Sequence, residues 1–174
     1  MKTLLSTIFA ATMMLLPMSM SSTAQDTDYI SAEHNLSAED DLAIRQVIAR
    51  LNHALDAADY DLYASFFAED GVFESGFGDA IGPAQVAAAL DQVRPFIINK
   101  RHVAGNFVIS GEGDDAVVTT YLIVFEREAG LEYVGSAINV DTMRRIDGEW
   151  MVVRHASTLD PATERYIQEQ MQQQ

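Results

Sequence analysis

The 174-residue chain contains no cysteine, which excludes disulfide bonds, a thiol nucleophile and thiolate-bound metals. Basic residues are also scarce, since 11 lysines and arginines stand against 26 aspartates and glutamates, for a formal net charge of −15. A surface this acidic repels nucleic acid and anionic membranes. We therefore expect neither as a partner of the mature protein.

Motifs for metals and nucleotides are missing as well. The chain has four histidines, and no two of them have a short metal-ligand spacing. Gly76-Phe77-Gly78 has neither a lysine nor a helix placed to hold a phosphate. We therefore expect no metal ion and no nucleotide or other cofactor.

The first 24 residues have the layout of a secretory signal peptide. Lys2 gives a positive start, residues 4–16 are largely apolar, and Ser22-Thr23-Ala24 offers small residues for cleavage. The apolar run is too short and too weakly flanked for a spanning helix, although a membrane anchor or a disordered leader is the alternative interpretation. We expect export to a periplasm or to the outside of the cell.

The remaining chain divides into three parts. Residues 25–36 are polar and mixed, as is typical of a flexible arm. Residues 37–160 have the length and patterning of one domain, and residues 161–174 form a polar, glutamine-rich helix or tail. This last segment is either docked loosely, used in an oligomer or frayed.

Three helices are predicted in the first half of the domain. Ser37 can cap a long amphipathic helix that continues to about Ala57, and Asp59 can cap a short one over residues 60–67. Gly82-Pro83 begins the third helix, because proline is favoured in a first turn. Between them we expect a turn at Glu69-Asp70-Gly71, followed by a short strand.

The second half changes to a period of two, which indicates strands. The predicted strands cover residues 101–110, 116–127, 131–145 and 149–159. Asp147-Gly148 between the last two is a strong hairpin signal. Helices grouped on one face of an antiparallel sheet define an α+β fold. We expect a curved antiparallel sheet wrapped around three helices, shaped as a cone whose open end can take a small ligand.

The outer face of this sheet is predicted to be unusually apolar. Its expected members are Val118, Leu122, Val124, Val134 and Ile138. We therefore predict a homodimer formed through this face.

Several local motifs match a known family. They are Leu-Asp-Ala-Ala-Asp-Tyr-Asp (55–61), Phe-Ala-Glu-Asp-Gly (67–71), Gly82-Pro83, Arg101-His102 with Asn106, and Arg-Arg-Ile-Asp-Gly-Glu-Trp (144–150). Over about residues 37–160 the chain resembles the SnoaL-like family of the nuclear transport factor 2-like superfamily. This group includes scytalone dehydratase, lindane dehydrochlorinase and the small subunits of ring-hydroxylating dioxygenases. The same fold also hosts non-enzymatic binders, so the resemblance predicts the fold more specifically than the function.

The resemblance implies a catalytic pair. Asp56 matches an aspartate that orients a pocket histidine, and His102 lies where that histidine is expected. A carboxylate can fix the tautomer of an imidazole that acts as general base. The alternative is that Asp56 caps the next helix or meets Arg101 while His102 is an ordinary core residue.

Further residues are candidates for substrate binding. Asn139 matches a substrate-binding asparagine, with a buried asparagine paired to the backbone as the alternative. Tyr121 and Tyr133 can supply hydroxyl donors, although tyrosine is common in strands. Asp141 shares the face of Asn139 and either assists proton transfer or pairs with an arginine, Arg101 or Arg154.

Two functions follow from these residues. The first is a cofactor-independent lyase or isomerase that removes a proton from a small apolar carbonyl or hydroxyl compound. The second is a non-catalytic ligand-binding or assembly module of the same fold. The dehydratase set is incomplete, because its second pocket histidine has no counterpart near Thr120 and Tyr121, and Ala137 replaces its pocket serine.

Overall fold

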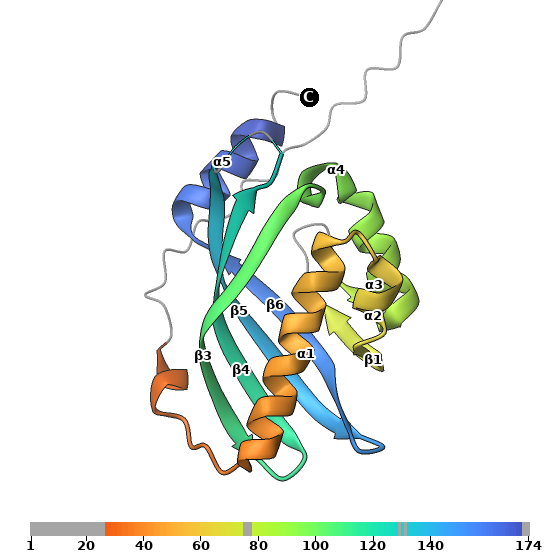
Figure 1. The fold of residues 1–174 in the computed structure, drawn as a ribbon, viewed down its shortest axis with the longest axis vertical. Coiled ribbons are helices and arrows are strands. Elements are labelled where there is room, and N and C mark those ends of the chain that lie inside the picture. The colour runs from red at the N-terminus through yellow and green to blue at the C-terminus, as the bar shows by residue number, and fades with distance from the viewer. Residues whose placement is uncertain (1–26, 75–77, 129, 131, 172–174) are drawn as a thin grey trace, which may run out of the picture.

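The computed structural model describes residues 27–74, 78–128, 130 and 132–171 (Figure 1). The predicted signal peptide lies outside the described residues. The elements follow in the order η1 (Asp28–Ser31), α1 (Ala38–Asp56), α2 (Tyr60–Ala64), β1 (Phe67–Phe73), β2 (Ala80–Ile81), α3 (Gly82–Gln92), α4 (Arg94–Ile97), β3 (Lys100–Glu112), β4 (Asp115–Glu126), β5 (Tyr133–Ile146), β6 (Glu149–Leu159) and α5 (Pro161–Met171). No helix in this described part is long and apolar enough to cross a membrane.

One curved sheet in the order β2-β1-β6-β5-β4-β3 carries the fold. Strands β3 to β6 pair antiparallel with their chain neighbours, as predicted. Strand β1 joins β6 in the parallel direction, so the sheet is mixed at that edge. Helix α1 crosses one face of the sheet, with α2 and α3 beside it (Figure 1). The α+β fold class is confirmed.

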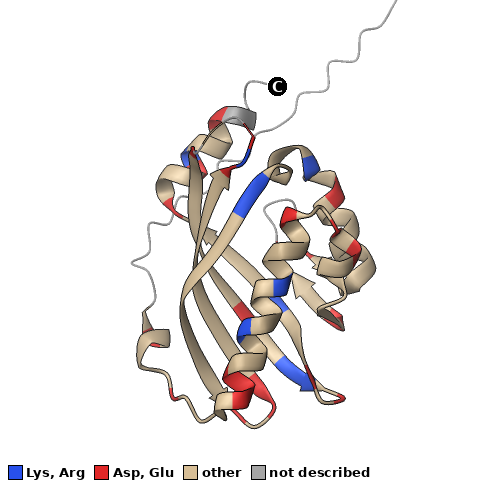
Figure 2. Ribbon diagram, in the orientation of Figure 1, with Lys and Arg blue, Asp and Glu red and all other residues tan. Residues whose placement is uncertain are grey.

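Helix α1 begins and packs as the sequence predicts. The Ser37 hydroxyl accepts a hydrogen bond from the Asp40 backbone N–H at 3.1 Å, which satisfies one free donor of the first turn. The Asp40 side chain also belongs to an acidic first turn, visible in red at one end of α1 (Figure 2). Ile44, Ile48 and Leu51 recur at helical spacing and are buried. This apolar stripe holds α1 on the sheet.

The region after α2 differs from the prediction. The short helix ends at Ala64, and Phe67 already begins β1, which continues through the expected turn at 69–71. Both Phe67 and Val72 pair with β6, and the residues between them bulge out of register. Pairing with β6 and burial of Phe67 outweigh the local turn signal. The partner strand lies some 80 residues further along the chain, so the local sequence pattern does not indicate this pairing.

The Asp147-Gly148 hairpin is confirmed. Asp147 has φ = 52° and Gly148 has φ = 87°, so both lie in the left-handed region that a two-residue hairpin turn requires. Strands β5 and β6 pair from Ile146–Glu149 at this turn to Ala137–Leu159 at the far end, with one shift of register between Met143 and Thr142.

Two β-bulges change which side chains face the helices. Val134 of β5 and Val153 of β6 are each one extra residue, with no partner in the neighbouring strand, β4 and β5 respectively. Each bulge shifts the alternation by one position. We call the face of β5 that carries the buried residues Ala137, Asn139, Asp141 and Met143 the inner face. The bulge at Val153 brings His155, which simple alternation puts on the other side, onto this inner face opposite Asp141.

The predicted outer face is wrong for strand β4. Val118 is completely buried, and Leu122 and Val124 pair with residues of the inner face. The outward residues are instead the intervening ones. The exposed apolar side chains here are Val103, Tyr121, Ile123 and Phe125. An apolar outer face exists, but its β4 members alternate with those expected, whereas Ile138 of β5 lies on this face opposite Tyr121, as predicted.

Both ends of the domain are attached to the sheet. In the predicted arm, the Asn35 N–H donates to the Gly111 carbonyl at 2.9 Å, and the Gly111 N–H donates to the Glu33 carbonyl at 3.1 Å. In α5, the buried Thr163 hydroxyl accepts a hydrogen bond from the Ser136 N–H at 2.8 Å. The part of the arm near Asn35 therefore lies hydrogen-bonded at the edge of β3.

Candidate active site

The first candidate pair joins the end of α1 to strand β3. The Asp56 carboxylate oxygen Oδ1 lies 2.8 Å from His102 Nδ1, and the same oxygen accepts the His102 backbone N–H at 3.0 Å. Asp56 is the last residue of α1, and His102 is the third residue of β3. Their side chains are only 5% and 7% exposed. Helix and strand thus bring together two residues that lie 46 positions apart.

This contact defines which nitrogen of His102 is available. A neutral imidazole that donates from Nδ1 to the carboxylate carries its lone pair on Nε2. No described residue hydrogen-bonds Nε2, and this atom is not among the fully buried polar atoms that lack a partner. The arrangement can therefore accept a proton at Nε2 and stabilise the resulting imidazolium with Asp56.

The alternatives for Asp56 hold in part. Arg101 Nη1 lies 3.4 Å from Asp56 Oδ2, so the carboxylate serves the arginine and the histidine together. The Arg101 side chain is 46% exposed, and solvent screens this longer contact. Asp56 does not cap the next helix, because Asp59 does so by accepting the Leu62 N–H at 3.1 Å.

A second histidine–aspartate pair lies on strands β5 and β6. His155 Nδ1 is 2.6 Å from Asp141 Oδ1, and both residues are buried. The imidazole stacks on Phe73, with ring centres 5.2 Å apart and planes 8° apart. Burial and the nearby Asp141 carboxylate raise the pKa of Tyr63 above its ordinary range. Asp141 is therefore a hydrogen-bond partner of a histidine, and neither predicted arginine reaches it: Arg154 pairs with Glu74, and Arg101 lies against Asp56.

Asn139 lies inward, as predicted, in a row of polar residues. Its Oδ1 accepts a hydrogen bond from the Ser157 hydroxyl at 2.6 Å, so its partner is a side chain rather than the backbone. On its other side Asn139 is in register with Thr120 of β4. Thr120 is 1% exposed, and its hydroxyl has no hydrogen-bond partner among the described residues. Such an orphaned donor is uncommon in a folded protein.

The two predicted tyrosines do not join this row. Tyr121 pairs with Ile138 on the outer face and is 46% exposed. Burial and a hydrogen bond to Tyr121 raise the pKa of Tyr29 in the N-terminal arm. Tyr133 is 59% exposed, and its hydroxyl lies 2.7 Å from Ser136 Oγ. The bulge at Val134 turns Tyr133 away from Asn139, so neither tyrosine is positioned to bind a ligand there.

Sequence reasoning missed His155 and Ser157. Simple alternation from Trp150 puts both residues on the outer side of β6, and the bulge at Val153 reverses this. The available signal was the repeated placement of polar groups two apart, in Asn139–Asp141 on β5 and His155–Ser157 on β6. Two such runs in neighbouring strands indicate a polar patch on one face.

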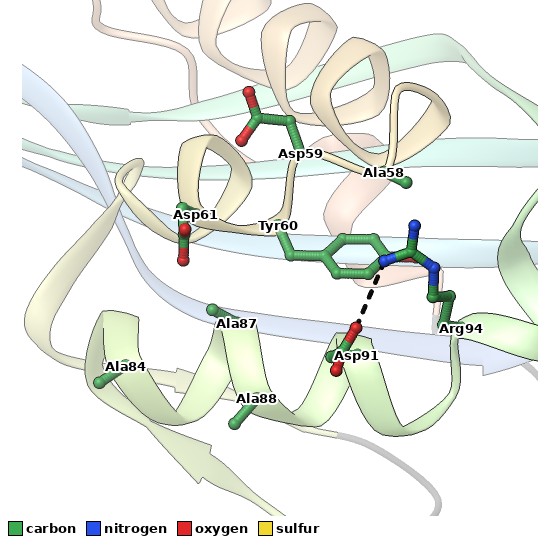
Figure 3. A pocket seen from close by; sticks show the side chains of 9 residues that line it. All are labelled: Ala58, Asp59, Tyr60, Asp61, Ala84, Ala87, Ala88, Asp91 and Arg94. Carbon is green, nitrogen blue, oxygen red and sulfur yellow. Dashed lines mark hydrogen bonds and ion pairs between the residues drawn. The ribbon is translucent and has the colours of Figure 1, made fainter.

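A hollow of about 470 Å³ lies elsewhere, between α2 and α3 (Figure 3). Arg94 lies over the Tyr60 ring at 5.6 Å and pairs with Asp91 at 3.4 Å. The remaining lining residues are alanines and the acids Asp59 and Asp61. This hollow contains neither histidine pair. Within the described ranges, no group of three or more histidines and acids is placed to hold a metal ion.

Comparisons with known proteins give a family match and several solved structures that this chain resembles. The SnoaL-like domain family matches residues 36–156. A Nostoc punctiforme PCC 73102 protein of unknown function with a cystatin-like fold is 33% identical, with a TM-score of 0.70, over 74% of this chain and 96% of that one. A nuclear transport factor 2-like protein from Novosphingobium aromaticivorans is 28% identical, with a TM-score of 0.64, over 74% and 89% of the two chains.

A third solved structure comes from Catenulispora acidiphila and is in complex with S-DNPA. It is 27% identical, with a TM-score of 0.66, over 74% of this chain and 99% of that one. The comparison with curated proteins gave no match.

The helices on one face of a curved sheet, with polar pairs turned inward, define a protein of the cystatin-like, nuclear transport factor 2-like class. Within this class, the chain belongs to the SnoaL-like domain family. The resemblance seen in the sequence is thereby confirmed.

Proposed function

We propose that this SnoaL-like protein is exported and is a cofactor-independent lyase or isomerase in which His102 removes a proton from a small apolar carbonyl or hydroxyl compound. The observation that carries the proposal is the 2.8 Å contact between Asp56 Oδ1 and His102 Nδ1 inside the domain. Signal-like residues 1–24 support export. A solved relative with a bound compound supports ligand binding by this family.

The step follows from the chemistry of the pair. His102 Nε2 takes a proton from the carbon of the substrate, and the imidazolium that forms is stabilised by Asp56. The electron pair of the broken C–H bond either expels a leaving group or shifts a double bond. Asn139, whose Nδ2 donor group is free of the Ser157 contact, is suited to stabilise the oxyanion that develops.

A generic carbon acid tests this step without knowledge of the natural substrate. Ring opening of 5-nitrobenzisoxazole begins with removal of a C–H proton and releases a coloured phenolate. We expect the protein to accelerate this reaction and His102→Ala to lower the rate by about 100-fold or more, the usual contribution of a positioned base. The matched control is His53→Ala, because His53 is exposed on the same helix as Asp56.

The alternative is a non-catalytic binding module, and the sharing of Asp56 between Arg101 and His102 favours it, because the pair also ties α1 to β3. If His102→Ala opens the ring as fast as the unmodified protein while its stability falls, the pair is structural. That outcome would sink the lyase or isomerase proposal and leave the binding role.

A further inference from the structure

We propose that Ser157, His155 and Asp141 form a second reaction centre, a serine nucleophile with its base and orienting acid, which hydrolyses small uncharged esters. This centre uses none of the residues of the Asp56–His102 pair. It therefore goes beyond the proton-abstraction chemistry proposed above.

The three side chains are connected in the order that acyl transfer needs. Asp141 Oδ1 lies 2.6 Å from His155 Nδ1, and His155 Nε2 lies 3.5 Å from Ser157 Oγ. Donation from Nδ1 to the carboxylate leaves Nε2 as an acceptor that faces the hydroxyl. A nucleophile–base distance at the long end of hydrogen bonding is common before a substrate binds.

The hydroxyl hydrogen of Ser157 has two possible acceptors. In the structure it points to Asn139 Oδ1 at 2.6 Å. Rotation about the Cβ–Oγ bond redirects this hydrogen toward His155 Nε2 without moving any heavy atom. Ser157 can thus change from a hydrogen bond that holds it in place to the one that activates it.

The positions of the three residues suit their roles. Asp141 is 2% exposed and His155 is 9% exposed, whereas Ser157 is an exposed residue. The imidazole is held from one side by its stack on Phe73. The orienting acid and base are therefore fixed in the interior, and the nucleophile is open to an incoming ester.

A donor for the oxyanion lies in the next strand. Asn139 is directly opposite Ser157, and Thr120 of β4 is directly opposite Asn139 on its far side. The Asn139 amide can donate from Nδ2, because its contact with Ser157 uses Oδ1. An ester carbonyl oxygen beside Asn139 would gain stabilisation from this amide as it becomes negative.

The reaction balances with water as the only co-reactant. Ser157 Oγ attacks the ester carbonyl carbon while its proton passes to His155 Nε2. The bond from carbon to the alcohol oxygen breaks, and that oxygen takes the proton from Nε2. Water then attacks the acyl-serine, gives its proton to Nε2, and the acid leaves as the proton returns to Ser157. The net charge of −15 disfavours anionic esters.

The pairing of the strands places the Ser157–His155–Asp141 centre at a distance from His102. His102 is paired with Val124 of β4, four residues from Thr120 in the same strand. At roughly 3.3 Å per residue, the two rows are about 13 Å apart along β4. Variants of His102 and of Ser157 can therefore each be tested against the activity of the other centre, whereas Asn139 is a candidate oxyanion donor for both.

Labelling with a fluorophosphonate tests the nucleophile directly. The reagent forms a bond from its phosphorus to an activated serine oxygen and releases fluoride. We expect one adduct on the purified full-length protein, found at Ser157 by peptide mass mapping, together with hydrolysis of p-nitrophenyl acetate. Ser157→Ala should remove the adduct and lower the hydrolysis rate by about 100-fold or more. His155→Gln should retain less than about 1% of the labelling rate.

Thr158→Ala is the matched control. Thr158 is the next hydroxyl residue of β6, is exposed, and pairs with Ile138 on the opposite face. This variant should label and hydrolyse like the unmodified protein. Because Ser157 is exposed, Ser157→Ala should keep the circular dichroism spectrum of the folded state. Absence of any adduct, an adduct at another residue, or equal hydrolysis by Ser157→Ala would overturn the proposal.

Discussion

Replacing Asp56 by alanine or by asparagine separates the contacts that this carboxylate makes. A single oxygen, Oδ1, accepts both the His102 backbone N–H at 3.0 Å and the His102 ring at 2.8 Å. The other oxygen, Oδ2, faces Arg101 at 3.4 Å. Alanine removes all three contacts. Asparagine keeps an acceptor at Oδ1 and loses only the charge and the contact with Arg101.

The expected costs differ for a physical reason. A hydrogen bond to a charged acceptor contributes about 1.5–3 kcal/mol, so loss of two such bonds in a buried site should cost about 3–5 kcal/mol. In Asp56→Asn the two bonds become neutral, which costs about 0.5–1 kcal/mol each. The half-exposed Arg101 contact adds at most about 1 kcal/mol. We expect about 1–3 kcal/mol for asparagine.

Urea unfolding followed by far-ultraviolet circular dichroism measures both values at pH 7. For a chain of this size 1 kcal/mol shifts Tm by about 2–4 °C, so the alanine variant should melt about 6–20 °C lower. Asp70→Ala on the exposed side of β1 is the control and should stay within about 0.5 kcal/mol. Equal losses for alanine and asparagine, or a loss below about 1 kcal/mol for alanine, would refute the hydrogen-bonding role of Oδ1.

Three further outcomes are expected. In Gly135→Ala the new Cβ would lie 2.5 Å from Thr163 Cγ2, so α5 should detach at a cost of about 1–3 kcal/mol, seen as faster amide exchange at Ser136. The Lys100 hydrogen bond lowers the pKa of Glu126 to about 2, so its stabilisation is present above the unfolded value of about 4.3 and is lost as the pH falls toward 2. Glu126→Gln should therefore differ from the unmodified protein at pH 6 and match it near pH 2; a constant difference would contradict this. Finally, light scattering should give the mass of a homodimer, and Ile123→Asp on the apolar outer face should give a monomer. A monomer mass for the unmodified protein at all concentrations would exclude the dimer.

Much of the fold was predictable because its signals are local. The Ser37 cap, the apolar stripe of α1 and the Asp147-Gly148 turn each depend on a few neighbouring residues, and each forms as expected. The match to the SnoaL-like family has the same origin in short motifs. By contrast, the start of β1 at Phe67 depends on a parallel pairing with Val152, which no local pattern indicates.

The contact between Asp56 and His102 was expected from the resemblance, and the geometry places the two atoms within hydrogen-bond reach. The second pair could not be found in this way. A bulge at Val153 is one extra residue in a ladder, and its position depends on how β6 fits against β5 and β1 together. Alternation along one strand therefore assigns the wrong face to His155 and Ser157.

The chain alone thus specifies its long first helix, its four long strands, their order and the acidic, cysteine-free character of the protein, because these follow from residue type and short-range spacing. Which polar side chains meet was decided by strand register and by the bulges at Val134 and Val153. These features arise from packing between residues far apart in the chain. For this reason Tyr133 turned outward, and His155 turned inward to meet Asp141.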